Sequence, residues 1–516
     1  MAETPLMRDG SEEGGRGVKT KAAHRVRTLG KLSLIGIMYF SVAGGPEGTE
    51  TLVKTGGPLA TFIGIIVLGV VFAVPLALMT AELSTMYPEN GGFVLWAKAA
   101  FGDTAGGMAG WLQFCCSAVD TALYPGLFLT YVSQTMHADF AEEIKWAIKG
   151  GFIVMITVLN LAGIDSVGHG SSAMMFFLLA PFGVIALICA TGAFTGTTVT
   201  GWPFETANLA ESIPNPDWGQ FVLVLIWNMG MWETASVCSG EVDDVSVQFP
   251  PALAITVVLV VLNYILPIAS FVGLNGDASK YDNGFYITII DTVGGPFWST
   301  WLGVSQCVSA SGLFTNGIVK NAWMLCGMGE QGMLPTVFAS RLKWTGAPGV
   351  AIAITQLVTV GMVLYGDFEA VLAVDMLLYT ASLLLEIAST IYLRHTEPDL
   401  ERPYRIPCDG ALLCLFFMPS VAIVFFGYAM AEFHDLLVTA IFIILGLILV
   451  EMLRRCKQHR PAWFAGDETV EHVEHHDPFA HQRKPEDEDG MYQSEDGFDR
   501  DTRMLLPNES TIRGIA

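Results

Sequence analysis

Residues 41–50 read SVAGGPEGTE, and this stretch interrupts the first long apolar run of the chain, residues 32–54. Three glycines and a proline within five residues disfavour an α-helix, because each glycine costs about 1 kcal/mol and the proline about 3 kcal/mol. The proline also removes a backbone donor. Inside a lipid bilayer, freed backbone groups must be satisfied by other parts of the protein or by a ligand. The stretch therefore predicts a broken helix that lines a cavity.

The composition indicates a chain that is solvated mainly by lipid. Of its 516 residues, 52% are hydrophobic and 15% are charged, whereas about 25% are charged in a typical soluble protein. A membrane span needs about 20 mostly apolar residues. We expect an all-α polytopic membrane protein with twelve transmembrane helices. The twelve apolar runs lie at 32–54, 58–82, 104–134, 146–164, 171–195, 217–240, 251–274, 296–328, 349–365, 368–394, 410–431 and 435–453.

A second interruption lies in the sixth run, where residues 227–233 read WNMGMWE. It follows the first interruption by five helices. Broken helices at matching places in two halves of a transporter indicate an inverted repeat with a binding site near the membrane midplane. We expect helices 1–5 and 6–10 to form a 5+5 inverted repeat, with helices 1 and 6 broken and helices 11 and 12 outside the repeat.

The basic residues predict the orientation of the chain in the membrane. The segment that ends at Lys31 holds seven lysines and arginines, which places the N-terminus in the cytoplasm. The basic loops that follow place the C-terminus on the same side. We expect a transporter domain at residues 29–455, between a disordered N-terminus at 1–28 and a disordered acidic tail at 456–516.

The tail holds 14 acidic residues after Arg454 and adds to the net charge of −23. Such a segment is typical of disordered, solvated chain. Within it, Asp501 followed by Leu505 and Leu506 has the spacing of an acidic dileucine sorting signal. The expected location is the plasma membrane, and the dileucine pattern leaves an endosomal or vacuolar membrane open.

Acidic side chains at membrane depth are costly, which makes them functional candidates. A cluster of carboxylates would bind an organic cation, and tryptophans at the second break would add cation–π attraction. A buried carboxylate could also carry a coupling proton. An alternative for Glu50 and Glu233 is that each caps the start of a half-helix. The candidates are Glu47, Glu50, Asp120 and Glu233, with Asp375 and Glu386 in the tenth run.

The breaks by themselves leave the ligand open. Helix ends at a break carry opposite partial charges, so these ends are compatible with an amino acid, an amine or an ion. Lys320 lies late in the eighth run, and we interpret it as snorkelling to the cytoplasmic interface.

Four loop sequences together resemble a known family. They are PENGGF at 88–93, GEV at 240–242 with FPPA at 249–252, GEQGMLP at 329–335 and RPYRIP at 402–407. In this order and at these spacings they are similar to the loops of the amino acid–polyamine–organocation transporters. The resemblance covers about residues 28–460 and implies a leucine-transporter-like fold.

Within that superfamily, the chain most resembles the polyamine uptake transporters of plants and protists, in the L-type amino acid transporter branch. The likeness rests on the two breaks and on residues 120–125, with Glu233 where those proteins usually carry aspartate. It implies proton-coupled import of polyamines such as putrescine and spermidine, with Glu50, Asp120 and Glu233 as candidates for amine binding and coupling. The expected substrate-binding residues are Gly44, Gly45, Gly48, Glu50, Asp120, Tyr124, Trp227, Asn228, Trp232 and Glu233.

Two features depart from this family's pattern. The plant members carry acidic residues in helix eight where this chain reads FTNG at 314–317. Some relatives carry a coupling lysine in helix five, and residues 171–195 contain none. An amino acid transporter, for example one for cationic amino acids, is therefore an alternative, and a nutrient-sensing receptor of the same fold is another.

Other function classes lack support in the sequence. An ion channel would lack the paired breaks, and a membrane enzyme would need a nucleophile or metal cluster that the sequence does not indicate. We expect no enzymatic activity, no cofactor, no metal and no nucleic-acid partner. The external loops offer no suitable cysteine, so no disulfide-linked glycoprotein subunit is expected.

Overall fold

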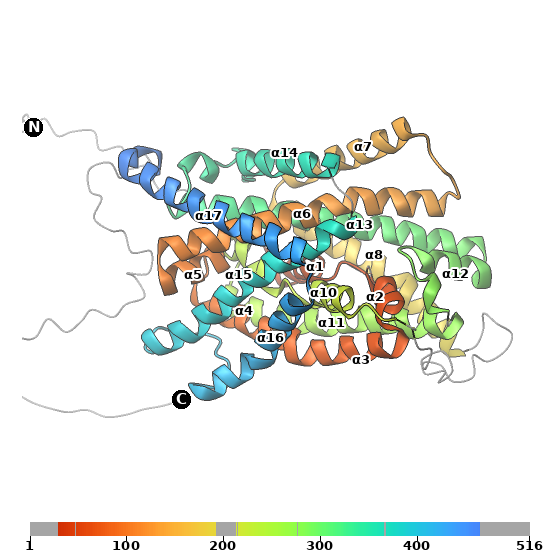
Figure 1. Cartoon of the computed structure of the whole chain (residues 1–516). Helices are drawn as coiled ribbons and strands as arrows, with labels where there is room; N and C mark the ends of the chain where they lie inside the picture. Colours follow the sequence, from red (N-terminus) through yellow and green to blue (C-terminus); the bar gives the residue numbers. More distant parts are fainter. Residues whose placement is uncertain are drawn as a thin grey trace, which may run out of the picture. The chain divides into compact units, whose positions relative to one another are not determined.

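The computed structural model describes residues 29–464 except for Glu47, residues 192–212, Pro214, Gly276 and residues 366–367 (Figure 1). The chain divides into two compact units, Met1–His475 and His476–Ala516, and every described residue belongs to the first. The N-terminal segment 1–28, the acidic tail beyond residue 464 with its dileucine pattern, and Glu47 lie outside the described residues.

The described residues form helices joined by turns and loops, with one isolated bridge between Leu29 and Val242. Before residue 192 the elements are α1 (Lys31–Val42), α2 (Thr49–Gly56), α3 (Pro58–Leu68), the π-helix η1 (Gly69–Ala73), α4 (Val74–Met86), α5 (Phe93–Phe101), α6 (Asp103–Thr135), α7 (Glu142–Leu161) and α8 (Ile164–Thr191). After residue 212 they are α10 (Trp218–Met229), the 3₁₀-helix η2 (Trp232–Glu241), α11 (Val245–Leu274), η3 (Ala278–Lys280), α12 (Phe285–Gly294), α13 (Pro296–Glu330), η4 (Thr336–Ala339), α14 (Gly349–Tyr365), α15 (Phe368–Thr396), α16 (Ala411–Met430), α17 (Phe433–His459) and η5 (Pro461–Trp463).

The helical, polytopic class expected from the sequence is confirmed. The described part of each of the twelve apolar runs falls on a helix or on consecutive helices. Among the described residues, nine helical stretches are long and apolar enough to cross a membrane, and α1, α12 and part of α14 are apolar but shorter. The sequence did not predict α5 and α12, because both are too short to stand out as apolar runs. The last helix continues past Arg455 to His459.

The interrupted helices occupy the centre of the packing. In the stretch Trp218–Glu241, which contains the second break, 94% of the most apolar 18-residue segment is buried. The corresponding share in α17 is 11%. Helix α1 is buried on nearly all sides and packs against α8, α11 and α13. A helix that is apolar all round belongs in the interior of a bundle, so the two breaks lie among other helices.

Helix α4 begins with a local distortion that its proline explains. Pro75 lacks a backbone donor, and its ring excludes the normal hydrogen bond to the carbonyl of Val71. The π-helical turn η1 precedes this proline. The Val71 carbonyl instead accepts a hydrogen bond from the Ser420 hydroxyl of α16, at 3.0 Å. The freed backbone group is thus satisfied inside the protein, as membrane burial requires.

Helices α6 and α13 run side by side through the bundle, and α15 packs against α6 (Figure 1). These three long helices carry Asp120, Lys320 and Asp375 respectively. Since α13 also contacts α1 and η2, the charged residues of the long helices lie within reach of both breaks.

Candidate binding site between the helix breaks

The first break separates α1 from α2, as the sequence predicted. Gly44 and Gly48 have φ angles of +64° and +79°, in the left-handed region that favours glycine. A Cβ atom on Gly48 would lie 2.8 Å from the ring of Trp227 and 3.0 Å from the amide nitrogen of Asn228. The two breaks therefore pack directly on each other. The freed carbonyl of Gly44 accepts a hydrogen bond from the Ser309 hydroxyl of α13.

The second break lies between α10 and η2. Met231 has a φ angle of +63°, a left-handed conformation that costs a non-glycine residue roughly 1–2 kcal/mol. Its N–H donates to the Tyr379 hydroxyl at 2.6 Å, and its carbonyl accepts from the Thr234 hydroxyl at 2.7 Å. A Cβ atom on Gly230 would lie 2.8 Å from the Tyr379 ring. Tyr379 of helix α15 thus packs against the break and accepts the hydrogen bond of its freed N–H group.

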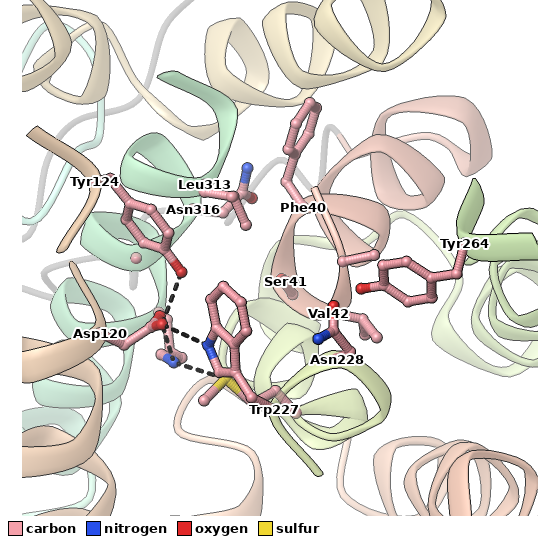
Figure 2. Close-up of a pocket in the computed structure, with 14 residues that line it drawn as sticks. Phe40, Ser41, Val42, Asp120, Tyr124, Trp227, Asn228, Tyr264, Leu313 and Asn316 are labelled. Carbon is pink, nitrogen blue, oxygen red and sulfur yellow. Dashed lines mark hydrogen bonds and ion pairs between the residues drawn. The ribbon is translucent and has the colours of Figure 1, made fainter. Parts of the chain in front are cut away.

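A pocket lies where the ends of α1 and α10 meet α6, α11 and α13, and its cavity has a volume of about 20 Å³. Figure 2 shows Asp120 and Tyr124 on one side of it and Phe40 and Tyr264 on other sides, with Trp227 between them. It is lined by Phe40, Ser41, Val42, Ala43, Asp120, Tyr124, Trp227, Asn228, Met231, Tyr264, Leu313, Asn316, Gly317 and Lys320.

Asp120 is the acidic residue of this lining, and it is 4% exposed. Its Oδ1 atom accepts hydrogen bonds from the Tyr124 hydroxyl at 2.7 Å and from Trp227 Nε1 at 3.0 Å (Figure 2). Its Oδ2 atom lies 3.9 Å from the Nζ atom of Lys320. The carboxylate is therefore held in one orientation, with Oδ2 directed to a cation.

Lys320 was interpreted from the sequence as snorkelling to the cytoplasmic interface, and that interpretation is wrong. The residue is 5% exposed and lines the pocket, with Nζ 3.5 Å from the Met231 sulfur. Every residue of α13 from Gly312 to Gly329 is buried. The lysine stem therefore has no lipid-facing route along which its ammonium group could reach the interface.

Glu233 and Trp232 lie behind the second break rather than in the pocket lining. Glu233 is fully buried and accepts hydrogen bonds from Gln113 Nε2 at 2.9 Å and from the Tyr379 hydroxyl at 3.4 Å. The Trp232 indole donates to the Met229 carbonyl at 2.8 Å. These contacts connect η2 to α6 and α15.

Glu50 is also buried away from the pocket lining, at the start of α12. Its carboxylate accepts hydrogen bonds from the backbone N–H groups of Gly284 at 3.0 Å and Tyr286 at 2.9 Å. On the same helix α2, Lys54 pairs with Asp282, just before α12. Glu50 therefore caps the start of α12 and not the start of its own helix, α2. We call this set of contacts the α2–α12 contact.

The two acids of the tenth run lie on α15. Glu386 is buried and accepts a hydrogen bond from the Ser382 hydroxyl at 3.0 Å. Asp375 is buried close enough to Asp120, Lys320 and the Cys116 thiol to interact with them electrostatically. A second carboxylate thus lies near the Asp120–Lys320 pair without lining the pocket.

Three of the loop motifs meet at Arg341. Its guanidinium group pairs with Glu241 at 3.0 Å and with Glu330 at 2.9 Å. The Asn90 amide donates to the same Glu241 oxygen at 2.8 Å, and the backbone N–H of Leu29 donates to the Glu241 carbonyl at 3.1 Å. We call these residues the Arg341 cluster. It joins the end of η2 to the loops after α4 and α13.

Of the ten predicted substrate-binding residues, the pocket brings together Asp120, Tyr124, Trp227 and Asn228. Gly44, Gly45 and Gly48 form the first break beside it, as their left-handed backbone shows. Sequence reasoning missed the lining residues of α1, α11 and α13. A detectable signal was present on α13, where Asn316 and Lys320 are polar, four residues apart and hence on one helix face.

Comparisons with known proteins agree with this architecture. The family model for amino acid permeases matches residues 29–449. The chain is 31% identical to the polyamine transporter PUT1 of Oryza sativa subsp. japonica, over 84% of this chain and 80% of that protein. It is 28% identical to the polyamine transporter RMV1 of Arabidopsis thaliana, over 85% of this chain and 88% of that protein. It shares 23% identity with the human cystine/glutamate transporter, over 64% of this chain and 66% of that protein. This multi-pass membrane protein therefore belongs to the amino acid permease family of transporters.

Proposed function

We propose that this protein is a secondary active transporter that imports polyamines, organic cations of the putrescine and spermidine type. The observation that carries the proposal is the buried carboxylate of Asp120 in a pocket between two helix breaks. Tyr124 and Trp227 hold one carboxylate oxygen, at 2.7 and 3.0 Å, and direct the other to a cation. Two relatives of the chain are named polyamine transporters.

The lining of the pocket suits an alkyl ammonium ion. An ammonium group would donate to Asp120, and its methylene chain would pack on the aromatic faces of Phe40 and Trp227. Aromatic rings near a desolvated cation add about 2 kcal/mol of cation–π attraction. A charge-assisted hydrogen bond adds about 1.5–3 kcal/mol. Together these interactions would compensate the loss of water around the amine.

The proposed architecture has twelve spans. The first repeat comprises α1 with α2, α3 with α4, α6, α7 and α8, and the second comprises α10 with η2, α11, α13, α14 and α15. Helices α16 and α17 lie outside the repeat. In alternating access, the bundle of broken helices moves against the other helices. The α2–α12 contact and the Arg341 cluster join these parts at two separate places, so we propose that the two contacts open in turn.

Coupling to a proton is part of the proposal. The candidates are Glu50, Asp120 and Glu233, all three buried carboxylates. The basic N-terminal segment supports cytoplasmic termini, and we place the protein in the plasma membrane, without a disulfide-linked glycoprotein subunit. The transporter domain would comprise residues 29–455, flanked by disordered cytoplasmic segments at 1–28 and 456–516.

Uptake of radiolabelled putrescine and spermidine into proteoliposomes, at acidic and neutral external pH, tests this function. Wild-type protein should take up both, and faster at acidic external pH. The variant Asp120→Asn should lose most uptake, while Asp165→Asn, at an exposed site on α8, should match wild type. Absence of polyamine uptake by wild-type protein would reject the function. Undiminished uptake by Asp120→Asn would reject the assigned site.

An amino acid transporter is the second candidate, and one observation favours it. The Lys320 ammonium lies in the pocket opposite Asp120, so the pair offers one partner for a carboxylate and one for an amine. Competition distinguishes the two candidates. Inhibition of labelled substrate uptake by arginine or lysine, but not by spermidine, would favour the amino acid.

A further inference from the structure

We propose that Lys320 is a specificity-determining residue that acts as a fixed cation in the substrate site. Its ammonium group occupies a position beside Asp120 that a substrate ammonium group must take. The site therefore favours short diamines over longer polyamines. This inference rests on the proposed polyamine function and deepens it.

The geometry places Lys320 in direct competition with a substrate. Tyr124 and Trp227 both donate to Oδ1 of Asp120. The remaining oxygen, Oδ2, is the one that faces Lys320 Nζ at 3.9 Å. An incoming ammonium group needs the same oxygen, so it must displace the lysine or share the carboxylate with it.

The lysine is confined to the pocket by its surroundings. It is 5% exposed, and Nζ is 3.5 Å from the Met231 sulfur at the second break. A thioether sulfur is a weak acceptor, so it anchors the ammonium group loosely. The Lys320 group can therefore shift within the pocket, but the buried length of α13 prevents it from leaving the protein interior.

Lys320 also changes the charge of the whole site. Its ammonium group faces the carboxylate of the pocket lining, that of Asp120, at 3.9 Å. It cancels part of the negative charge that would otherwise attract a polycation. Charges at such distances interact several times more strongly in a partly buried site than in water, so this cancellation lowers the affinity for cations.

The penalty grows with the number of charges on the substrate. Putrescine carries two ammonium groups, spermidine three and spermine four. Each additional ammonium group placed in the pocket is repelled by Lys320, and the other lining residues add no further carboxylate. The preference should therefore follow the order putrescine, spermidine, spermine, opposite to the order that a purely acidic site would give.

Equilibrium binding of labelled putrescine, spermidine and spermine to the purified full-length protein tests this inference. For wild-type protein we expect the tightest binding with putrescine. In Lys320→Met the affinity for spermine should rise at least tenfold and that for putrescine less, so that the order reverses. Lys320→Arg keeps the charge and should keep the wild-type order. Lys280→Met, at an exposed lysine, is the matched control.

Three outcomes would overturn the inference. The first is wild-type protein that binds spermine more tightly than putrescine, a result that needs no variant. The second is a folded Lys320→Met or Lys320→Gln protein with the wild-type order. The third is weaker binding of every polyamine in both variants, which would assign Lys320 a structural or carboxylate-binding role. Failure of wild-type protein to bind any polyamine would instead reject the proposed function.

Discussion

Replacing Glu50 by glutamine separates two roles for this residue. The sequence suggested an amine-binding or coupling carboxylate. The structure shows a carboxylate that accepts two backbone hydrogen bonds at the start of α12, from Gly284 at 3.0 Å and Tyr286 at 2.9 Å. Glutamine keeps one acceptor oxygen but directs an NH₂ group at the other N–H. If Glu50 holds α12, the change should loosen that helix and leave substrate recognition intact.

The size of the effect follows from the contacts that are lost. One hydrogen bond to a charged group contributes about 1.5–3 kcal/mol, and a buried donor left without an acceptor costs about 1–3 kcal/mol. A net loss of about 3 kcal/mol is therefore reasonable, and it corresponds to roughly a 100-fold change in a local opening equilibrium. Amide hydrogen exchange reports such local opening.

The assay is hydrogen exchange, read by mass spectrometry on peptides that cover residues 281–290. Glu50→Gln should speed exchange there by roughly 100-fold. Glu143→Gln, at an exposed site on α7, should exchange like wild type. The half-saturation concentration for putrescine should change by less than about threefold, which is under about 1 kcal/mol. Unchanged exchange together with a large rise in that concentration would refute this reasoning and restore Glu50 as a binding residue.

Three further substitutions test other contacts. Gly48→Ala should abolish uptake, because alanine disfavours the left-handed φ angle of this position and its Cβ atom would lie 2.8 Å from the Trp227 ring, which would disturb both breaks. Wild-type uptake by this variant would refute the packing of the breaks on each other. Arg341→Gln should favour opening of the Arg341 cluster, and faster chemical labelling of a cysteine engineered nearby would report that opening. Unchanged labelling would contradict the role of Arg341 in keeping the cluster closed. Glu82→Gln should lower thermal stability in detergent, because the Arg394 guanidinium loses its buried carboxylate partner and keeps the exposed Asp409. Breaking a buried pair costs about 3–5 kcal/mol, and wild-type stability would contradict this prediction.

The sequence predicted the features of the fold that depend on local chemistry. Three glycines and a proline within five residues disfavour a helix strongly, so the break at residues 41–50 was evident. The break at 227–233 was also predicted, although its strain falls on Met231, a residue type that gives no signal for a left-handed conformation. Short helices such as α5 and α12 were missed, because their apolar runs are too brief to indicate a span.

The partners of the charged residues were not predictable in the same way. Glu50 accepts hydrogen bonds from the backbone of Gly284 and Tyr286, which lie more than 230 residues after it in the chain. No local sequence pattern indicates such a pairing. Lys320 was assigned to the interface because lysines near helix ends usually reach water. Only the packing of α13 against α6 shows that it faces Asp120 instead.

Equilibrium binding of labelled putrescine to purified protein tests the central claim most directly, namely that Asp120 binds the substrate amine between the two breaks. Wild-type protein should bind the diamine saturably. Asp120→Asn should weaken binding roughly 30- to 100-fold, the equivalent of one charge-assisted hydrogen bond of about 2–3 kcal/mol. Asp165→Asn should bind like wild type. Binding by Asp120→Asn as tight as that of the wild type would contradict the account.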